Sequence, residues 1–195
     1  TLELIAESAQ PLTSIPMVLS VNCVSCPEDN AWINRFAEKT GAANLVTAGN
    51  VNPESLIKNT LIGGDCFEVE NVTAFGNGSS RGTFSKGGTN IGLESGVVLC
   101  TGNVSLLPGP NLINNANGGF SSNTPDDPDL AALASGNQWD LSKIEFDFTP
   151  TSSKVQFDFV FGSEEYCEFV FSQFQDVFGF CITGPGITGN QNIAL

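Results

Sequence analysis

Acidic side chains gather in two segments that are rich in turn-forming residues. Glu164 and Glu165 follow one run of alternating apolar residues, and Asp176 precedes the next. If both runs are antiparallel strands, these carboxylates meet at one end of a sheet, and Asp127 and Asp129 can join them from a neighbouring connection. Carboxylate oxygens on loops are ligands that Ca²⁺ prefers. The pattern predicts a calcium site at these five residues, with a solvated acidic rim as the equal alternative, because no twelve-residue EF-hand spacing is present.

Two further activities are open for the same end of the molecule. A pair of carboxylates beside an apolar wall can hydrolyse a glycosidic bond, which would make Glu164 or Glu165 catalytic, but such a site is defined by geometry rather than by spacing. Trp32, Trp139 and Tyr166 could stack on sugar rings in a carbohydrate-binding groove. Aromatic side chains more often pack in a core, so both readings rank below the cation site.

The chain has six cysteines and no histidine. The lack of histidine removes Cys/His zinc sites, Ser-His and Cys-His nucleophiles and the commonest general base. An even number of widely spaced cysteines favours disulfides over a Cys-only metal site or free thiols, and therefore an oxidising compartment outside the cytoplasm. From predicted adjacency alone, the expected pairs are Cys66 with Cys100, Cys167 with Cys181, and Cys23 with Cys26.

The charge balance argues against one class of partner. Seven Lys and Arg stand against 21 Asp and Glu, which gives a net charge of −14. Nucleic acid is an unsuitable ligand, because proteins bind phosphate backbones through clustered basic residues. No run of about 18 apolar residues is present, so no segment is expected to span a membrane. The residues after Thr1 do not resemble a signal peptide, which fits a mature chain whose export signal has been removed.

Short strands are expected to position these residues. Apolar and polar side chains alternate most clearly at 144–148 and 155–161, which we expect to form an antiparallel hairpin around the turn at 149–153. A further strand is expected at 178–182, and glycine-punctuated runs predict several more between 67 and 100.

Helical signals are few and short. Capping residues and prolines predict helices after Asn30, over 54–61 and after Asp127, and residues 102–127 are expected to form a long loop. The whole pattern predicts an all-β fold, a jelly-roll-like antiparallel β-sandwich with two or three short helices. Residues 1–51 are expected to form an N-terminal extended arm plus a short helix, and residues 52–195 the sandwich.

Four motifs in chain order resemble the choice-of-anchor L domain of bacterial surface proteins. They lie at 52–64, at 92–102, at 127–130, and at 161–166 together with 176–180. The resemblance implies an exported protein of the Bacteroidota type, with type IX secretion or another anchor, and a role in surface display, adhesion or matrix building. It also implies that Glu164, Glu165, Asp129 and Asp176 occupy acidic positions of the family's motifs. Members usually continue beyond the last residue here, which implies a sandwich that its missing remainder or another chain completes.

The sequence therefore predicts a secreted, cell-surface structural or adhesive module without catalytic activity. We expect it to be a subunit of an extracellular assembly, held by disulfides and Ca²⁺, with other chains of that assembly as partners. A carbohydrate-binding module with a glycan partner is the alternative, followed by a glycan hydrolase.

Overall fold

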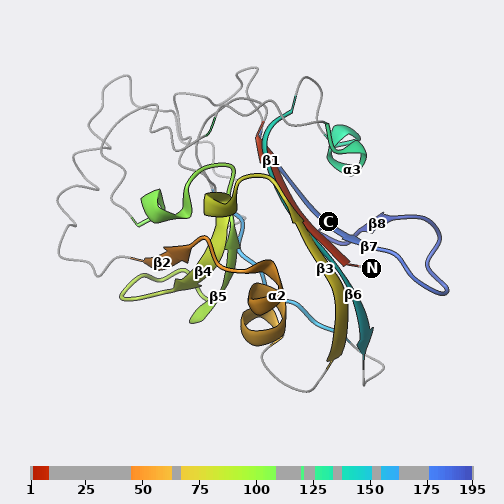
Figure 1. Cartoon of the computed structure of the whole chain (residues 1–195), viewed down its shortest axis with the longest axis horizontal. Coiled ribbons are helices and arrows are strands. Elements are labelled where there is room, and N and C mark those ends of the chain that lie inside the picture. Colours follow the sequence, from red (N-terminus) through yellow and green to blue (C-terminus); the bar gives the residue numbers. More distant parts are fainter. Residues whose placement is uncertain are drawn as a thin grey trace, which may run out of the picture.

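Two antiparallel sheets make up most of the computed structural model (Figure 1). The first has the strand order β3-β6-β1-β7-β8 and the second the order β2-β4-β5. The all-β class with few short helices is confirmed. The structure describes residues 2–8, 45–62, 67–108, 120, 126–133, 138–150, 155–162 and 176–194.

The strands and helices have the following bounds. The five-stranded sheet contains β3 (Phe67–Phe75), β6 (Trp139–Pro150), β1 (Leu2–Ser8), β7 (Asp176–Ile182) and β8 (Gln191–Asn192). The three-stranded sheet contains β2 (Val46–Gly49), β4 (Arg81–Ser85) and β5 (Ser95–Leu99). The helical elements are α2 (Pro53–Ser55), the π-helical η1 (Leu56–Leu61), the 3₁₀ turns η2 (Gly78–Ser80) and η3 (Val104–Leu106), and α3 (Pro128–Ala131).

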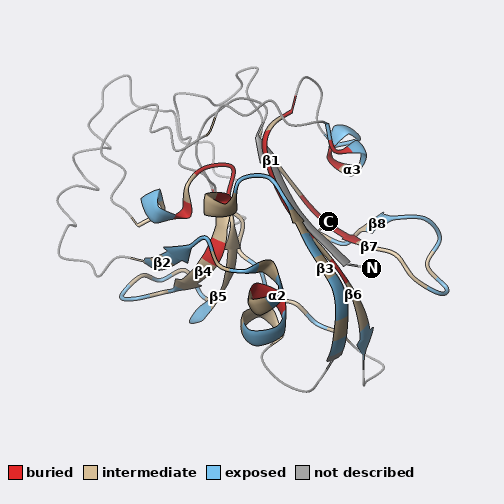
Figure 2. Cartoon of the chain, in the orientation of Figure 1, coloured by how far each residue is buried: buried red, intermediate tan, exposed pale blue. Residues whose placement is uncertain are grey.

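The main core lies on one face of β6. Ile144 and Phe146 alternate with polar residues along this strand, and both pack with Phe180 of β7. Leu56 and Ile57, in the helix that follows α2, complete this buried cluster. Figure 2 shows buried residues in that helix and along the strands of the larger sheet. The helix predicted over 54–61 is confirmed, and it contributes to the core rather than covering it from outside.

The predicted hairpin of residues 144–148 with 155–161 is wrong. In the described part of the chain β6 pairs with β3 and β1, and residues 155–161 carry no assigned strand. Phe157, Phe159 and Phe161 do share a face, because their rings lie 5.0–5.7 Å from the rings of Phe178 or Phe180. Alternation therefore identified the apolar face of this segment but not the neighbouring strand of β6, since sequential strands often, but not always, pair.

Residues 2–8 of the expected N-terminal arm form β1, a central strand of the larger sheet. Leu2 lies opposite Phe146 on one side and Ile182 on the other. The strand therefore bridges β6 and β7, and the sheet includes a segment far from both in the sequence. Residues 9–44, which hold the predicted first helix, lie outside the described residues.

A tight turn carries the chain from the larger sheet to the smaller one. Gly76 has a φ of 84°, and a Cβ there would lie 1.7 Å from the carbonyl oxygen of Leu141, so only glycine fits. Arg81 donates from Nη1 to the carbonyl oxygens of Phe75, Gly76 and Asn77 at 3.2–3.4 Å. Burial lowers the pKa of the Arg81 guanidinium from its ordinary value. These contacts fix the conformation of the turn between β3 and β4 and its packing against Leu141 of β6.

Replacing Phe146 by alanine should lower the free energy of unfolding by about 3–5 kcal/mol, because the side chain is 1% exposed and leaves a cavity in the core. Val46 is 60% exposed, so the Val46→Ala control should change it by less than about 0.5 kcal/mol. Urea denaturation followed by fluorescence measures both. Equal effects would contradict the position of the core.

Candidate functional site

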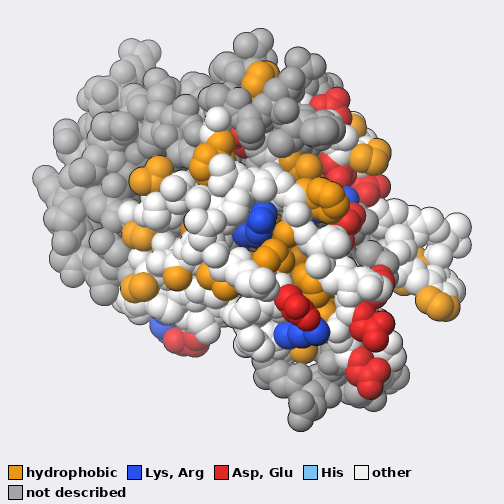
Figure 3. Space-filling model, viewed as in Figure 1, with side chains coloured by type: hydrophobic (Ala, Val, Ile, Leu, Met, Phe, Trp, Pro, Cys, Tyr) orange, Lys and Arg blue, Asp and Glu red, His pale blue; other side chains and the backbone are white. Residues whose placement is uncertain are grey.

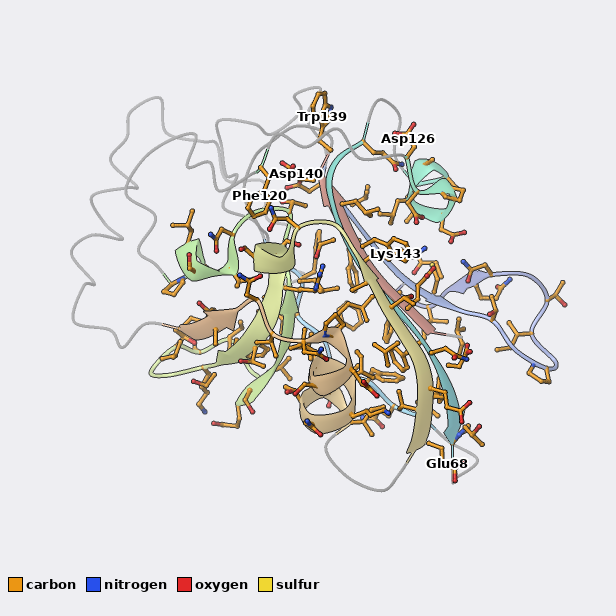
Figure 4. All side chains as sticks on the ribbon, viewed as in Figure 1. Glu68, Phe120, Asp126, Trp139, Asp140 and Lys143 are labelled. Atoms are coloured by element: carbon orange, nitrogen blue, oxygen red, sulfur yellow. The ribbon has the colours of Figure 1, made fainter. Side chains whose placement is uncertain are left out.

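Buried polar side chains gather where the segment with α3 meets the start of β6. Asp127, Gln138, Asp140 and Lys143 are each no more than 8% exposed. Figure 4 labels Asp126, Asp140 and Lys143 at this end of the larger sheet. Burying a charged or polar group is costly unless it has an ion-pair or hydrogen-bond partner. We therefore expect these side chains to bind one another or the nearby backbone.

Asp127 holds α3 in place with both oxygens of its carboxylate. Oδ1 accepts hydrogen bonds from the backbone N–H groups of Asp129 at 3.0 Å and Leu130 at 3.3 Å, which caps the helix. Oδ2 lies 2.9 Å from Nζ of Lys143. Leu130 is fully buried and packs with Leu141, so α3 is attached to the sheet by an apolar contact as well.

Lys143 lies between two carboxylates on the face of β6 opposite the main core. Its Nζ is 2.9 Å from Asp127 Oδ2 and 2.6 Å from Glu145 Oε1, and it lies 5.9 Å from the centre of the Phe75 ring. Thr73 donates from Oγ1 to the other oxygen of Glu145 at 3.4 Å. The register of β3 and β6 produces this arrangement, because Phe75 lies opposite Lys143 and Thr73 opposite Glu145. The side chains of Lys143, Asp127 and Glu145 are 10%, 6% and 25% exposed, so Glu145 is the most accessible of the three to water.

Gln138 and Asp140 attach the preceding loop to the same strand. Gln138 accepts from the Asp127 N–H at 2.5 Å and donates to the Asp127 carbonyl at 3.3 Å. Asp140 has a φ of 57°, which is unusual for a residue with a side chain, and its Oδ2 accepts from the Phe120 N–H at 3.1 Å. Gln138 therefore holds the backbone at Asp127, and Asp140 holds it at Phe120.

Three of the five predicted calcium ligands, Asp127, Asp129 and Asp176, lie in the described part of the chain. Asp127 and Asp129 lie with α3, which packs against the face of β7 that carries Val177. Alternation places Asp176 on the other face, with Phe178. Glu164 and Glu165 lie outside the described residues.

Within the described ranges, no group of three or more His, Cys, Asp or Glu could hold a metal ion. The calcium site stays a prediction, and it depends on the undescribed acidic segment.

Two of the six cysteines lie in the described part of the chain. Cys100 follows β5 and Cys181 lies in β7, and both are 3% exposed. Their expected partners Cys66 and Cys167, and the pair Cys23 and Cys26, fall outside the described residues, so the disulfides stay predictions. Of the aromatic residues predicted to bind sugar, Trp139 is half-buried at the start of β6, and Trp32 and Tyr166 are not described.

Gln138, Lys143 and Glu145 belong to this site but were not predicted from the sequence. The alternation assigned Glu145 to a wet face of the strand, and nothing in that pattern indicates that α3 covers part of it. The one available signal was the lysine itself, a lone cation between Asp140 and Asp147.

The family model of the choice-of-anchor L domain matches residues 45–195. The chain belongs to this family. The resemblance seen in the four motifs is therefore confirmed. The match begins at residue 45, before Asn52, the residue at which the domain was expected to start. Comparisons with curated proteins and with solved structures give no match.

A choice-of-anchor L protein is a surface-anchored or secreted protein, and the family is not an enzyme family. Among the described residues, the helices are too short or too polar to cross a membrane. The division of the chain into an arm and a domain stays a prediction.

Replacing Asp127 by alanine should destabilise the fold by about 3–5 kcal/mol, because it removes the helix cap and leaves Lys143 buried opposite one fewer carboxylate. Asp127→Asn retains a capping oxygen and should cost clearly less. Urea denaturation of the three proteins gives the order. If alanine and asparagine cost the same, the cap contributes nothing and the account of Asp127 is wrong.

Proposed function

We propose that this choice-of-anchor L chain is a non-catalytic structural or adhesive module of an extracellular assembly. The family match over residues 45–195 is the observation that carries the proposal. The polar cluster supports it, because both oxygens of Asp127 are occupied by protein donors and Lys143 contacts carboxylates of its own chain. Groups paired in this way fix the structure of the described part of the chain.

The exposed edge of the larger sheet also suits a module that assembles through specific contacts. β3 is one of the two edge strands of this sheet as described, and it carries the exposed carboxylates of Glu68 and Glu70. Asn71 has a φ of 53°, and the pairing of β3 with β6 shifts register between Glu70 and Thr73. Charges and bulges prevent unspecific pairing at sheet edges. Figure 3 shows acidic side chains on the side of the molecule where β3, β6 and α3 lie. Partner chains of the assembly would therefore bind elsewhere than along β3.

The proposal includes disulfides and Ca²⁺ as stabilising elements. A bond between Cys181, buried in β7, and Cys167 would fix the acidic segment against the larger sheet. Ca²⁺ bound by Glu164, Glu165 and Asp176 would neutralise part of the net charge of −14 at that end. Both elements suit a protein that functions outside the cell.

Calcium should raise the melting temperature of the oxidised chain by a few degrees, because a ligand at a hundredfold excess over its Kd stabilises the folded state by about 2.7 kcal/mol. The double variant Glu164→Gln, Asp176→Asn should not respond, and a chelator should reverse the effect in the wild type. Calorimetry with Mg²⁺ as the control ion measures this. A wild type that does not respond removes calcium from the proposal, and a glycan array then tests the carbohydrate-binding alternative.

A further inference from the structure

We propose that Lys143 and Asp127 form an intramolecular amide bond, with Glu145 transferring protons during its formation. This cross-link would join α3 covalently to β6. It goes beyond the proposed function, because it follows from the geometry of three side chains and holds whether or not the protein is an adhesin.

The amine of Lys143, which is the nucleophile, and the carboxyl group of Asp127, which is the electrophile, are already in contact and largely shielded from water. Nζ of Lys143 lies 2.9 Å from Oδ2 of Asp127, and the two side chains are 10% and 6% exposed. The carboxyl carbon is bonded to that oxygen, so the amine has only a short distance to travel. Holding two reacting groups in this way replaces a bimolecular encounter by an intramolecular one, with effective molarities of about 10⁵ M or more in well-oriented cases.

The carboxyl group of Asp127 is polarised for attack. Its Oδ1 accepts hydrogen bonds from the N–H groups of Asp129 and Leu130, and these donors would stabilise the negative charge that develops on this oxygen. The other oxygen, Oδ2, faces Lys143 and is the one that leaves. The helix cap therefore acts as an oxyanion hole in this reaction.

Glu145 is placed to move the proton that the attack releases. Its Oε1 lies 2.6 Å from Nζ, and Thr73 donates to its other oxygen. The Phe75 ring covers the amine on the side of β3. Glu145 is the most exposed of the three side chains at 25%, which gives the product water a way out.

The reaction balances without any further reactant. One proton moves from the Lys143 ammonium to Oδ2 of Asp127, which leaves a neutral amine and a carboxylic acid. The nitrogen lone pair attacks Cγ, and the carbonyl electron pair moves onto Oδ1. Glu145 then accepts a proton from the nitrogen and donates it to Oδ2. The C=O bond re-forms, the bond from Cγ to Oδ2 breaks, and one water leaves, so that Glu145 ends as the carboxylate it was at the start.

The pair of Lys58 and Glu54 shows why proximity of an amine and a carboxylate is not sufficient to predict an amide bond. Nζ of Lys58 lies 2.7 Å from Glu54, but these side chains are 42% and 61% exposed. The hydrogen bond from Lys58 and its charge lower the pKa of Glu54, which keeps that carboxylate ionised. Water surrounds the pair, so no amide is expected there, and Lys58 provides a matched control.

Intact-mass spectrometry of the denatured, reduced and alkylated full chain tests the proposal. The wild type should be lighter than its sequence by one water, about 18 Da, and a protease digest should contain a branched peptide joining residues 127 and 143. Lys143→Arg keeps the positive charge but lacks the nucleophilic amine, so it should have its full sequence mass. Glu145→Gln should be uncross-linked or react far more slowly. Lys58→Arg should lose one water like the wild type.

Asp127→Asn provides an independent test, because attack of the Lys143 amine on the side-chain amide releases ammonia in place of water. That variant should be lighter than its own sequence by one ammonia. A wild type at full sequence mass overturns the proposal, as does a Lys143→Arg chain that still loses water. Cross-linking of Glu145→Gln at the wild-type rate overturns the role assigned to Glu145.

Discussion

The contact between Asp127 and Lys143 fixes how the connection containing α3 is attached to the larger sheet. One residue caps a helix of four residues, too short to be stable alone, and the other projects from the longest strand of the sheet. Both charges are buried, and each has further partners: Glu145 contacts Lys143, and two backbone N–H groups donate to Asp127. The neighbouring contacts of Gln138 and Leu130 reinforce the same junction and give it one geometry.

β6 has to satisfy two different environments, one on each face. Its inner face carries Ile144 and Phe146 into the core, and its outer face carries Lys143, which contacts Asp127, and Glu145, which contacts Lys143. A slip of one residue in its pairing with β3 or β1 would exchange the two faces and bury the charges among phenylalanines. The ionic cluster therefore helps to specify the register of the central strand, in addition to holding α3.

The fold class and the core side chains could be predicted from local patterns, but the strand neighbours could not. Alternation correctly identified Ile144, Phe146 and Phe180 as buried. It could not indicate that residues 2–8 pass between β6 and β7, because that pairing joins segments more than a hundred residues apart and depends on the whole sheet. Capping chemistry predicted α3 from Asp127 and Pro128, since this signal is local.

The sequence pointed to one residue of the candidate site, Asp127, but not to the contacts that it makes. Asp127 was selected as a calcium ligand because it is acidic and lies in a loop, yet in the structure its carboxylate binds the helix N-terminus and a lysine. Lys143 was not predicted as a site residue, and a lysine on the polar face of a strand is ordinarily solvated. Its burial depends on tertiary contacts with Asp127 and with Phe75 of β3.

Burial of these charges also bears on the stability of the amide. A buried ion pair seldom stabilises a protein much, because the loss of hydration offsets most of the attraction between the charges. The pair of Asp127 and Lys143 carries that cost as long as it remains ionic. Conversion to a neutral amide removes both charges, keeps an oxygen to accept from Asp129 and Leu130, and releases a water to the solvent. The burial that destabilises the ion pair therefore favours formation of the amide bond. The exposed pair of Lys58 and Glu54 stays hydrated, so forming an amide there would relieve no such loss of hydration.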